Sequence, residues 1–67
     1  METESANLVL QHKKIPCRAN IPIRKAIIEN GLSPSAYLIL RDKQMITDDE
    51  IIKPGDIIEL ITVISGG

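Results

Sequence analysis

Two short hydrophobic runs near the start of the chain have the spacing of paired strands. Leu8-Val9-Leu10 and the segment 15–19 flank the polar stretch 11–14, a pattern that predicts a hairpin. Pro16 lies in the second run and has no amide proton to donate, so we expect this strand at an edge of the sheet. Side chains alternate along a strand. Three residues should therefore share one of its faces: Ile15, Cys17 and Ala19.

The spacing changes to that of a helix between Pro22 and Asn30. Apolar residues here recur every three or four positions and should form one buried face. They are Ile23, Ala26 and Ile27. Pro22 suits the first helical turn, where its missing amide proton costs least, and Asn20 is the expected N-cap. Gly31 is the expected stop at the C-terminal end.

The segment after the helix predicts a third strand over residues 36–41 and a charged turn at Asp42-Lys43. Met45-Ile46 can form a short fourth strand. Thr47-Asp48-Asp49-Glu50 has the capping-box pattern of a helix start. The run Lys53-Pro54-Gly55-Asp56 limits that helix to a single turn.

The longest apolar run, residues 57–64, predicts a strand, because it is too short and too rich in β-branched residues for a buried helix. Glu59 should face outward, which places Ile58 and Leu60 on the buried side. The other outward positions are apolar: Ile57, Ile61 and Val63. Such residues can form a docking surface or can simply pack against neighbours on the same face, and both interpretations stay open.

The order of elements is strand, strand, helix, strand, short strand, strand. If the last strand pairs with the first in parallel, a right-handed crossover lets the helix cover one face of the sheet. This is an α+β fold, the β-grasp arrangement of a mixed sheet packed on one main helix. We expect a flexible leader over residues 1–6, a single domain over 7–64 and a flexible tail over 65–67.

The length of 67 residues restricts the function. A domain of this size buries only about 60% of its unfolded surface, which leaves little material for both a core and an enclosed active site. We therefore expect a protein that is not itself an enzyme. The formal net charge is −1, the basic residues are scattered, and Tyr37 is the one aromatic residue, so direct nucleic-acid binding is not expected.

The first residues carry two glutamates and no apolar signal segment, and no apolar run approaches the length of a membrane span. We expect a cytoplasmic monomer. Cys17 is the single cysteine, so it has no disulfide partner in the chain and should fill core space as a small hydrophobe. His12 and the acidic run 48–50 lack further ligands at a useful spacing, so no metal site is predicted.

The ending of the chain narrows the function further. Residues 53–60, with the sequence KPGDIIEL, lead into the last strand and then directly into Ser65-Gly66-Gly67. This pairing of a final strand with a terminal diglycine resembles the ubiquitin-like sulfur-carrier proteins. These form a small β-grasp family that serves thiamine synthesis, molybdopterin synthesis and transfer-RNA thiolation. The resemblance covers most of the chain.

The resemblance implies a carrier mechanism. An E1-like adenylating enzyme would activate the carboxylate of Gly67 with ATP and magnesium, so the carrier needs no cofactor of its own. A sulfur donor of desulfurase or rhodanese type would convert it to a thiocarboxylate, and an acceptor synthase or thiolase would take up the sulfur. Gly66 and Ser65 would thread the active site of the partner. The docking residues would be Ile57, Glu59, Ile61 and Val63.

Three other functions fit the same sequence. The activated Gly67 could instead be joined to lysine residues of target proteins, as in a protein modifier. The chain could be the small subunit of a molybdopterin synthase, although its short length favours the thiamine and transfer-RNA thiolation types. A non-covalent β-grasp interaction module is the third, and it predicts that the tail is dispensable.

Overall fold

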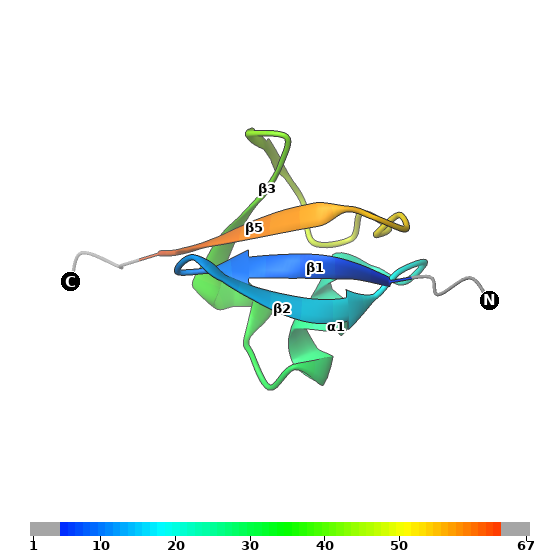
Figure 1. Ribbon diagram of the computed structural model, residues 1–67. Coiled ribbons are helices and arrows are strands. Elements are labelled where there is room, and N and C mark those ends of the chain that lie inside the picture. Colours follow the sequence, from blue (N-terminus) through cyan, green and yellow to red (C-terminus); the bar gives the residue numbers. More distant parts are fainter. Residues whose placement is uncertain (1–4, 64–67) are drawn as a thin grey trace.

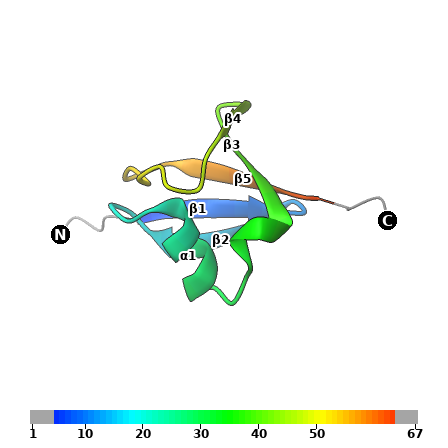
Figure 2. The same cartoon turned by 180° about the vertical axis from the view of Figure 1, so that it is seen from behind.

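A five-stranded mixed sheet forms the frame of the computed structural model, which describes residues 5–63 (Figure 1). In chain order the elements are β1 (Ser5–Leu10), β2 (Lys13–Arg18), α1 (Ile23–Glu29), the 3₁₀ helix η1 (Pro34–Ala36), β3 (Tyr37–Arg41), β4 (Gln44–Ile46) and β5 (Ile57–Thr62). The strands lie in the order β2-β1-β5-β3-β4. This topology, with α1 on one face, confirms the predicted β-grasp fold (Figure 2).

The first and last strands form the centre of the sheet. β1 and β5 are parallel, with Leu8 opposite Ile58 and Leu10 opposite Leu60. The parallel pairing predicted from the element order is therefore confirmed. β2 pairs only with β1 and lies at the edge of the sheet, which is the place expected for a strand that contains Pro16.

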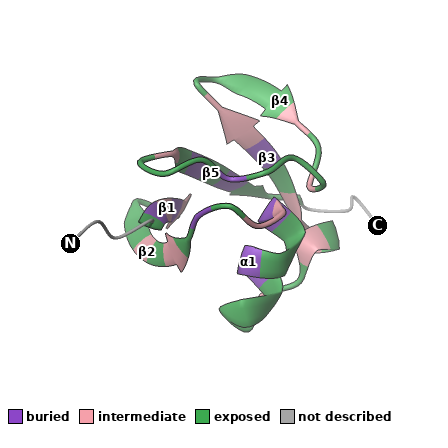
Figure 3. Ribbon diagram, turned by 90° about the vertical axis from the view of Figure 1, so that its right-hand side faces the viewer, coloured by how far each residue is buried: buried purple, intermediate pink, exposed green. Residues whose placement is uncertain are grey.

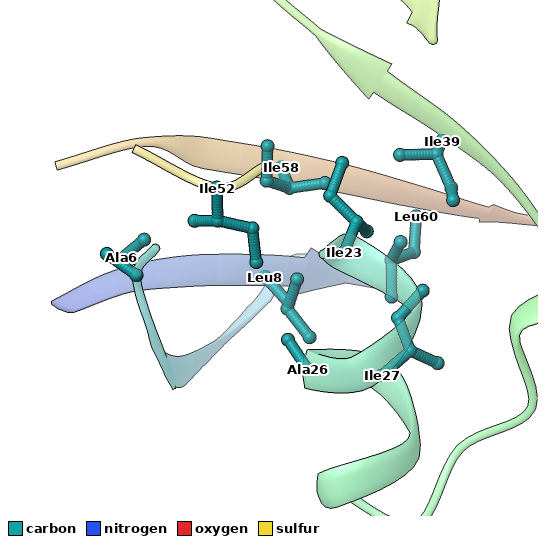
Figure 4. Packing of buried hydrophobic residues seen from close by; sticks show 10 residues of the cluster. Ala6, Leu8, Ile23, Ala26, Ile27, Ile39, Ile52, Ile58 and Leu60 are labelled. Atoms are coloured by element: carbon teal, nitrogen blue, oxygen red, sulfur yellow. The ribbon is translucent and has the colours of Figure 1, made fainter. Parts of the chain in front are cut away.

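The core lies between α1 and the inner face of the sheet. Ile23, Ala26 and Ile27 of the helix are fully buried, as their spacing predicts, and Figure 4 shows them directed toward the side chains of the central strands. Leu8 and Ile58 are equally buried from the sheet side. In Figure 3 the buried positions gather on the faces that the helix and the sheet turn toward each other. This arrangement leaves the opposite face of the sheet uncovered by the helix.

The C-terminal end of α1 is closed by Gly31, as predicted. Its φ of +78° is a left-handed conformation that glycine adopts without strain. The amide of Gly31 donates to the carbonyl of Ile28 at 2.9 Å, and the amide of Leu32 donates to that of Ile27 at 3.0 Å. These two bonds form a Schellman motif, which satisfies carbonyls that the helix itself cannot pair.

The N-terminal end of α1 differs from the prediction. The N-cap is Pro22, without a side-chain hydrogen bond, and not Asn20. The amide of Ile23 donates instead to the carbonyl of Glu50, and that of Arg24 to the carbonyl of Asp48, both at 2.9 Å. A distant loop therefore supplies the acceptors that a capping side chain normally provides.

The same contacts explain why the helix predicted to start at Thr47 is wrong. Residues 48–50 form a turn, and the carbonyls of Asp48 and Glu50 accept bonds from amides of α1 instead of amides further along their own segment. The backbone of Ile52 is held by pairing with another segment: its amide donates to Ile21 and its carbonyl accepts from Asn20. Burial of the Ile52 side chain stabilises this pairing.

The boundary of the predicted leader is also wrong by two residues. Ser5 and Ala6 belong to β1, where they lie opposite Arg18 and Cys17. Ala6 is buried in the core. A polar and small-residue segment can still pair as a strand when its partner strand is already positioned, which local composition does not reveal.

Both hairpin turns of the sheet are two residues long. Gln11 and His12 have φ angles of 52° and 68°, and Asp42 and Lys43 have 53° and 66°. Positive values at both positions are typical of the type I′ turn, whose twist matches that of the flanking strands. The charged turn predicted at Asp42-Lys43 is confirmed, whereas the first turn is shorter than the predicted stretch 11–14.

Candidate docking site

The outward face of β5 carries the residues predicted for docking. Ile57, Ile61 and Val63 are 54%, 42% and 47% exposed, and Glu59 is exposed as well, while Ile58 and Leu60 are buried. The predicted orientation of the strand is therefore confirmed. About half of the surface of each of the three apolar residues remains uncovered, so packing within the face accounts for only part of their environment.

Neighbouring strands extend this apolar surface. Leu38 lies opposite Ile61, and Leu40 lies opposite Glu59 on β3. Met45 of β4 is exposed and lies opposite Leu40. On the other side of β5, Val9 lies opposite Glu59. We call this surface the outer sheet patch; it comprises Val9, Leu38, Leu40, Met45, Ile57, Glu59, Ile61 and Val63.

The sequence-based prediction did not include Leu38 and Met45, because it assigned no inner and outer face to the third and fourth strands. The signal was present in the run from Tyr37 to Leu40, which is apolar throughout. A strand that is apolar on both faces has an outer face that needs cover or a partner. Since Ile39 is buried, the alternation of side chains places Leu38 and Leu40 outside.

Two grooves border the outer sheet patch. One, of about 440 Å³, lies at the edge formed by β3 and β4, and it is lined by Pro34, Tyr37, Leu38, Ile39, Met45, Ile46, Thr47 and Asp48. The other, of about 230 Å³, lies between the first hairpin turn and β5. It is lined by Val9, Gln11, His12, Glu59, Leu60, Ile61 and Thr62. The second groove gives the outer face a hollow into which a side chain of another protein can fit. The first is lined partly by residues of the helix-facing side, Ile39 and Ile46 among them.

The end of β5 is held firmly in the sheet. Thr62 lies opposite Tyr37, and the amide of Val63 donates to the carbonyl of Ala36 at 3.0 Å. Because β1 and β5 are parallel, the Gln11–His12 turn lies at this same end of the sheet (Figure 1). The predicted tail of Ser65, Gly66 and Gly67 lies outside the described residues.

Comparison with known proteins identifies the family to which this chain belongs. The model of the ThiS family matches residues 6–67. The chain belongs to the ThiS family. A similar protein is the sulfur carrier protein TtuB of Thermus thermophilus, which is 28% identical over 57 residues, 85% of this chain and 88% of that protein. The resemblance to the ubiquitin-like sulfur carriers is thereby confirmed.

The position of Cys17 in this ThiS-family chain agrees with a structural role. Its free thiol is half-buried on the inner side of β2 and packs against the core. Burial raises the pKa of the Cys17 thiol, and the nearby carboxylates of Asp56 and Glu29 raise it further. The reactive thiolate is therefore disfavoured at neutral pH.

Neither a metal centre nor a membrane segment is found in the part of the ThiS-family chain that the structure describes. Within residues 5–63, no group of three or more histidine, cysteine, aspartate or glutamate residues could hold a metal ion. The helices of the same range are all too short or too polar to cross a membrane. His12, the one histidine, is exposed in the first hairpin turn.

Proposed function

We propose that this protein is a sulfur carrier that holds sulfur as a thiocarboxylate on the C-terminal carboxyl group of Gly67. The observation that carries the proposal is the family match over residues 6–67, which extends beyond β5 and includes the terminal diglycine. The name of the relative from Thermus thermophilus, a sulfur carrier protein, supports the same function.

The chemistry explains why a partner enzyme is needed. An α-carboxyl group has a pKa of about 3.5, so at neutral pH it is an anion and a poor electrophile. Adenylation corrects this: a carboxylate oxygen of Gly67 attacks the α-phosphorus of ATP and releases pyrophosphate. A persulfide of the sulfur donor then displaces AMP, and a thiol cleaves the sulfur–sulfur bond to leave the thiocarboxylate. The partner supplies ATP, magnesium and the adenylating residues.

The body of the carrier contributes the docking surface. The outer sheet patch is broad and apolar, and its last residue, Val63, is bonded to Ala36 two positions before the predicted tail. Three extended residues span about 10 Å. When the patch is docked, Ser65 and Gly66 can therefore span a narrow channel that leads to a nucleotide. Glycine adds no side chain that would block this channel.

The sulfur acceptor is proposed to be a synthase of thiamine synthesis or a thiolase that modifies transfer RNA. Both consume sulfur from a carrier thiocarboxylate, and the small size of the domain suits either. The carrier itself makes no base contact in this scheme, in keeping with its scattered basic residues and single aromatic side chain.

Intact mass spectrometry tests the proposal. The purified protein is incubated with the activating enzyme of its own cell, ATP and a persulfide donor, and we expect the mass of one oxygen-to-sulfur exchange at the C-terminus. Omission of ATP should abolish the gain, because no leaving group forms. An unchanged mass in the complete mixture, with full complementation of the cell by a chain lacking Gly66 and Gly67, would replace the carrier with a non-covalent interaction module.

A further inference from the structure

Glu59 occupies an unusual position at the centre of the outer sheet patch. Its two neighbours across the sheet are Val9 and Leu40. Its neighbours along the same face of β5 are Ile57 and Ile61, both exposed. A single carboxylate is thus surrounded on four sides by apolar side chains.

No basic side chain within residues 5–63 forms an ion pair with Glu59. The ion pairs of this part of the chain join Arg18 to Glu29 and Arg41 to both Glu50 and Asp56. Lys14 lies on the same face, but it is opposite Val9 and therefore one strand further away. His12 lines the same groove as Glu59 without pairing with it.

A carboxylate in the middle of a surface has consequences once a partner covers it. The covering protein removes the water that solvates the charge, and this opposes binding unless a cation replaces the water. A charge at the rim would stay hydrated and would matter little. The central position of Glu59 therefore makes the charge of the partner decisive for binding.

The groove beside Glu59 provides the place for such a cation. It has a volume of about 230 Å³, and its walls combine apolar side chains of β1 and β5 with the polar residues of the first hairpin turn. A long side chain with an apolar stem and a charged end, such as arginine or lysine, matches this lining.

We propose that Glu59 receives an arginine or lysine side chain of the activating enzyme in this groove, and that this charge pair selects the enzyme. The inference rests on the proposed function and adds to it the chemistry of the partner surface: apolar, with one basic residue at its centre. Charge complementarity of this kind excludes other apolar surfaces, because they leave Glu59 desolvated and unpaired.

The same residue prevents two copies of the carrier from pairing through this face. A two-fold interface places a central residue close to its own copy. Two Glu59 carboxylates would then meet in an apolar environment, which is strongly unfavourable. The carrier can therefore expose an apolar sheet face and stay available to its enzyme.

Binding measurements on the full-length protein test the charge pair. Dissociation constants for the activating enzyme are compared for wild type, Glu59→Gln, Glu59→Lys and the control Glu29→Gln. Glu29 is exposed on α1, on the other side of the sheet, and its carboxylate pairs only with Arg18 among the described residues. We expect binding to weaken at least about tenfold for Glu59→Gln and about a hundredfold for Glu59→Lys, mainly through faster dissociation. Glu29→Gln should stay within about twofold.

Two outcomes separate this inference from the carrier function. If wild type gains sulfur but both Glu59 variants bind as tightly as Glu29→Gln, the charge pair is wrong and the carrier function stands. If wild type gains no sulfur, the carrier function fails, and the role of Glu59 is then decided by self-association alone.

Sedimentation measures self-association without any enzyme. Wild type should remain monomeric, whereas Glu59→Leu, with its apolar face complete, should form dimers at high protein concentration. Glu59→Gln removes the charge but keeps a polar group, so it should associate less than Glu59→Leu. A Glu59→Leu variant that folds with the melting temperature of wild type and stays monomeric at every concentration would overturn the self-association argument.

Discussion

Arg41 and Asp56 join the end of β3 to the loop that precedes β5. Nη2 of Arg41 donates a hydrogen bond to Oδ2 of Asp56 at 2.9 Å and another to the carbonyl of Ile51, also at 2.9 Å. The same Oδ2 accepts a bond from the amide of Lys53 at 2.9 Å. One carboxylate therefore fixes both the guanidinium and the turn from which the last strand starts.

We predict that Asp56→Ala lowers the free energy of unfolding by about 1–3 kcal/mol, since it removes the carboxylate that accepts from both Arg41 and the Lys53 amide. The side chains of Arg41 and Asp56 are each only 19% exposed, so water replaces the lost bonds poorly. Urea denaturation measures the loss. A double-mutant cycle with Arg41→Met should show coupling between the two sites, and additive effects would mean that the pair contributes nothing of its own.

The outer sheet patch predicts a difference between two exposed isoleucines. Ile61→Glu should leave the melting temperature nearly unchanged but weaken docking to the activating enzyme, because it places a second carboxylate beside Glu59. Ile28→Glu is the matched control, since Ile28 is 58% exposed on α1, away from the patch. It should affect neither folding nor docking. Equal loss of docking in both variants would move the interface away from this face.

Cys17→Ala should retain sulfur transfer. The thiol packs against the core, so its removal should cost only about 1 kcal/mol of unfolding free energy from lost packing. The mass gain at the C-terminus, measured under the conditions given above, checks the transfer. Loss of transfer by a variant that keeps its fold would assign Cys17 a chemical role.

The pH dependence of stability should also distinguish Cys17→Ala from wild type. Burial raises the pKa of the thiol above its ordinary value of 9.0 in the folded state. The folded state therefore binds the thiol proton more tightly than the unfolded state, and this contribution is fully present below about pH 8.5. It is lost as pH rises through the folded pKa. Wild type should thus lose more stability than Cys17→Ala in urea denaturation as the pH rises above the ordinary pKa of the thiol.

The tail gives the most direct prediction on function. One alanine added after Gly67 moves the carboxylate by about 3.5 Å and places a methyl group where glycine has none. Adenylation, followed as pyrophosphate release, should fall sharply, while the melting temperature should stay the same. Deletion of Gly67 should fail likewise, because the carboxylate stops short of the nucleotide. Full activity of both variants would contradict activation at the terminal carboxylate.

The sequence predicted those parts of the fold in which residue spacing directly determines burial. The inner face of α1 and the orientation of β5 follow from regular spacing, and Ile27 and Ile58 are buried as expected. Pro16 predicted the edge position of β2, because the missing amide proton follows from the residue type alone and does not depend on distant segments.

Errors arose where distant segments determine the local structure. The pattern at Thr47 is that of a helix start, but the carbonyls of Asp48 and Glu50 bind amides of α1. Asn20 is a good capping residue by type, yet its φ of 65° and its backbone bond to Ile52 give that segment a different role. Both errors have one cause, since loop and helix cap each other only after the chain has folded.

The candidate docking surface was predicted only in part for a related reason. The alternation within β5 placed Ile57, Ile61 and Val63 correctly, but the width of the patch depends on which strands lie beside it. Leu38 and Met45 belong to the patch because β3 and β4 lie beside β5 in the sheet. This order of strands cannot be inferred from the residues of one strand.

The central position of β5 also determines how the domain responds to mechanical force. β5 pairs with β1 at four positions and with β3 at five. If an enzyme draws the end of the chain into its channel, as the proposed function requires, the pull runs along β5 and loads both hydrogen-bond ladders in shear. Many bonds must then break together, whereas a strand at the edge could be peeled away one bond at a time. A central β5 should therefore resist withdrawal from the sheet better than a strand at the edge would.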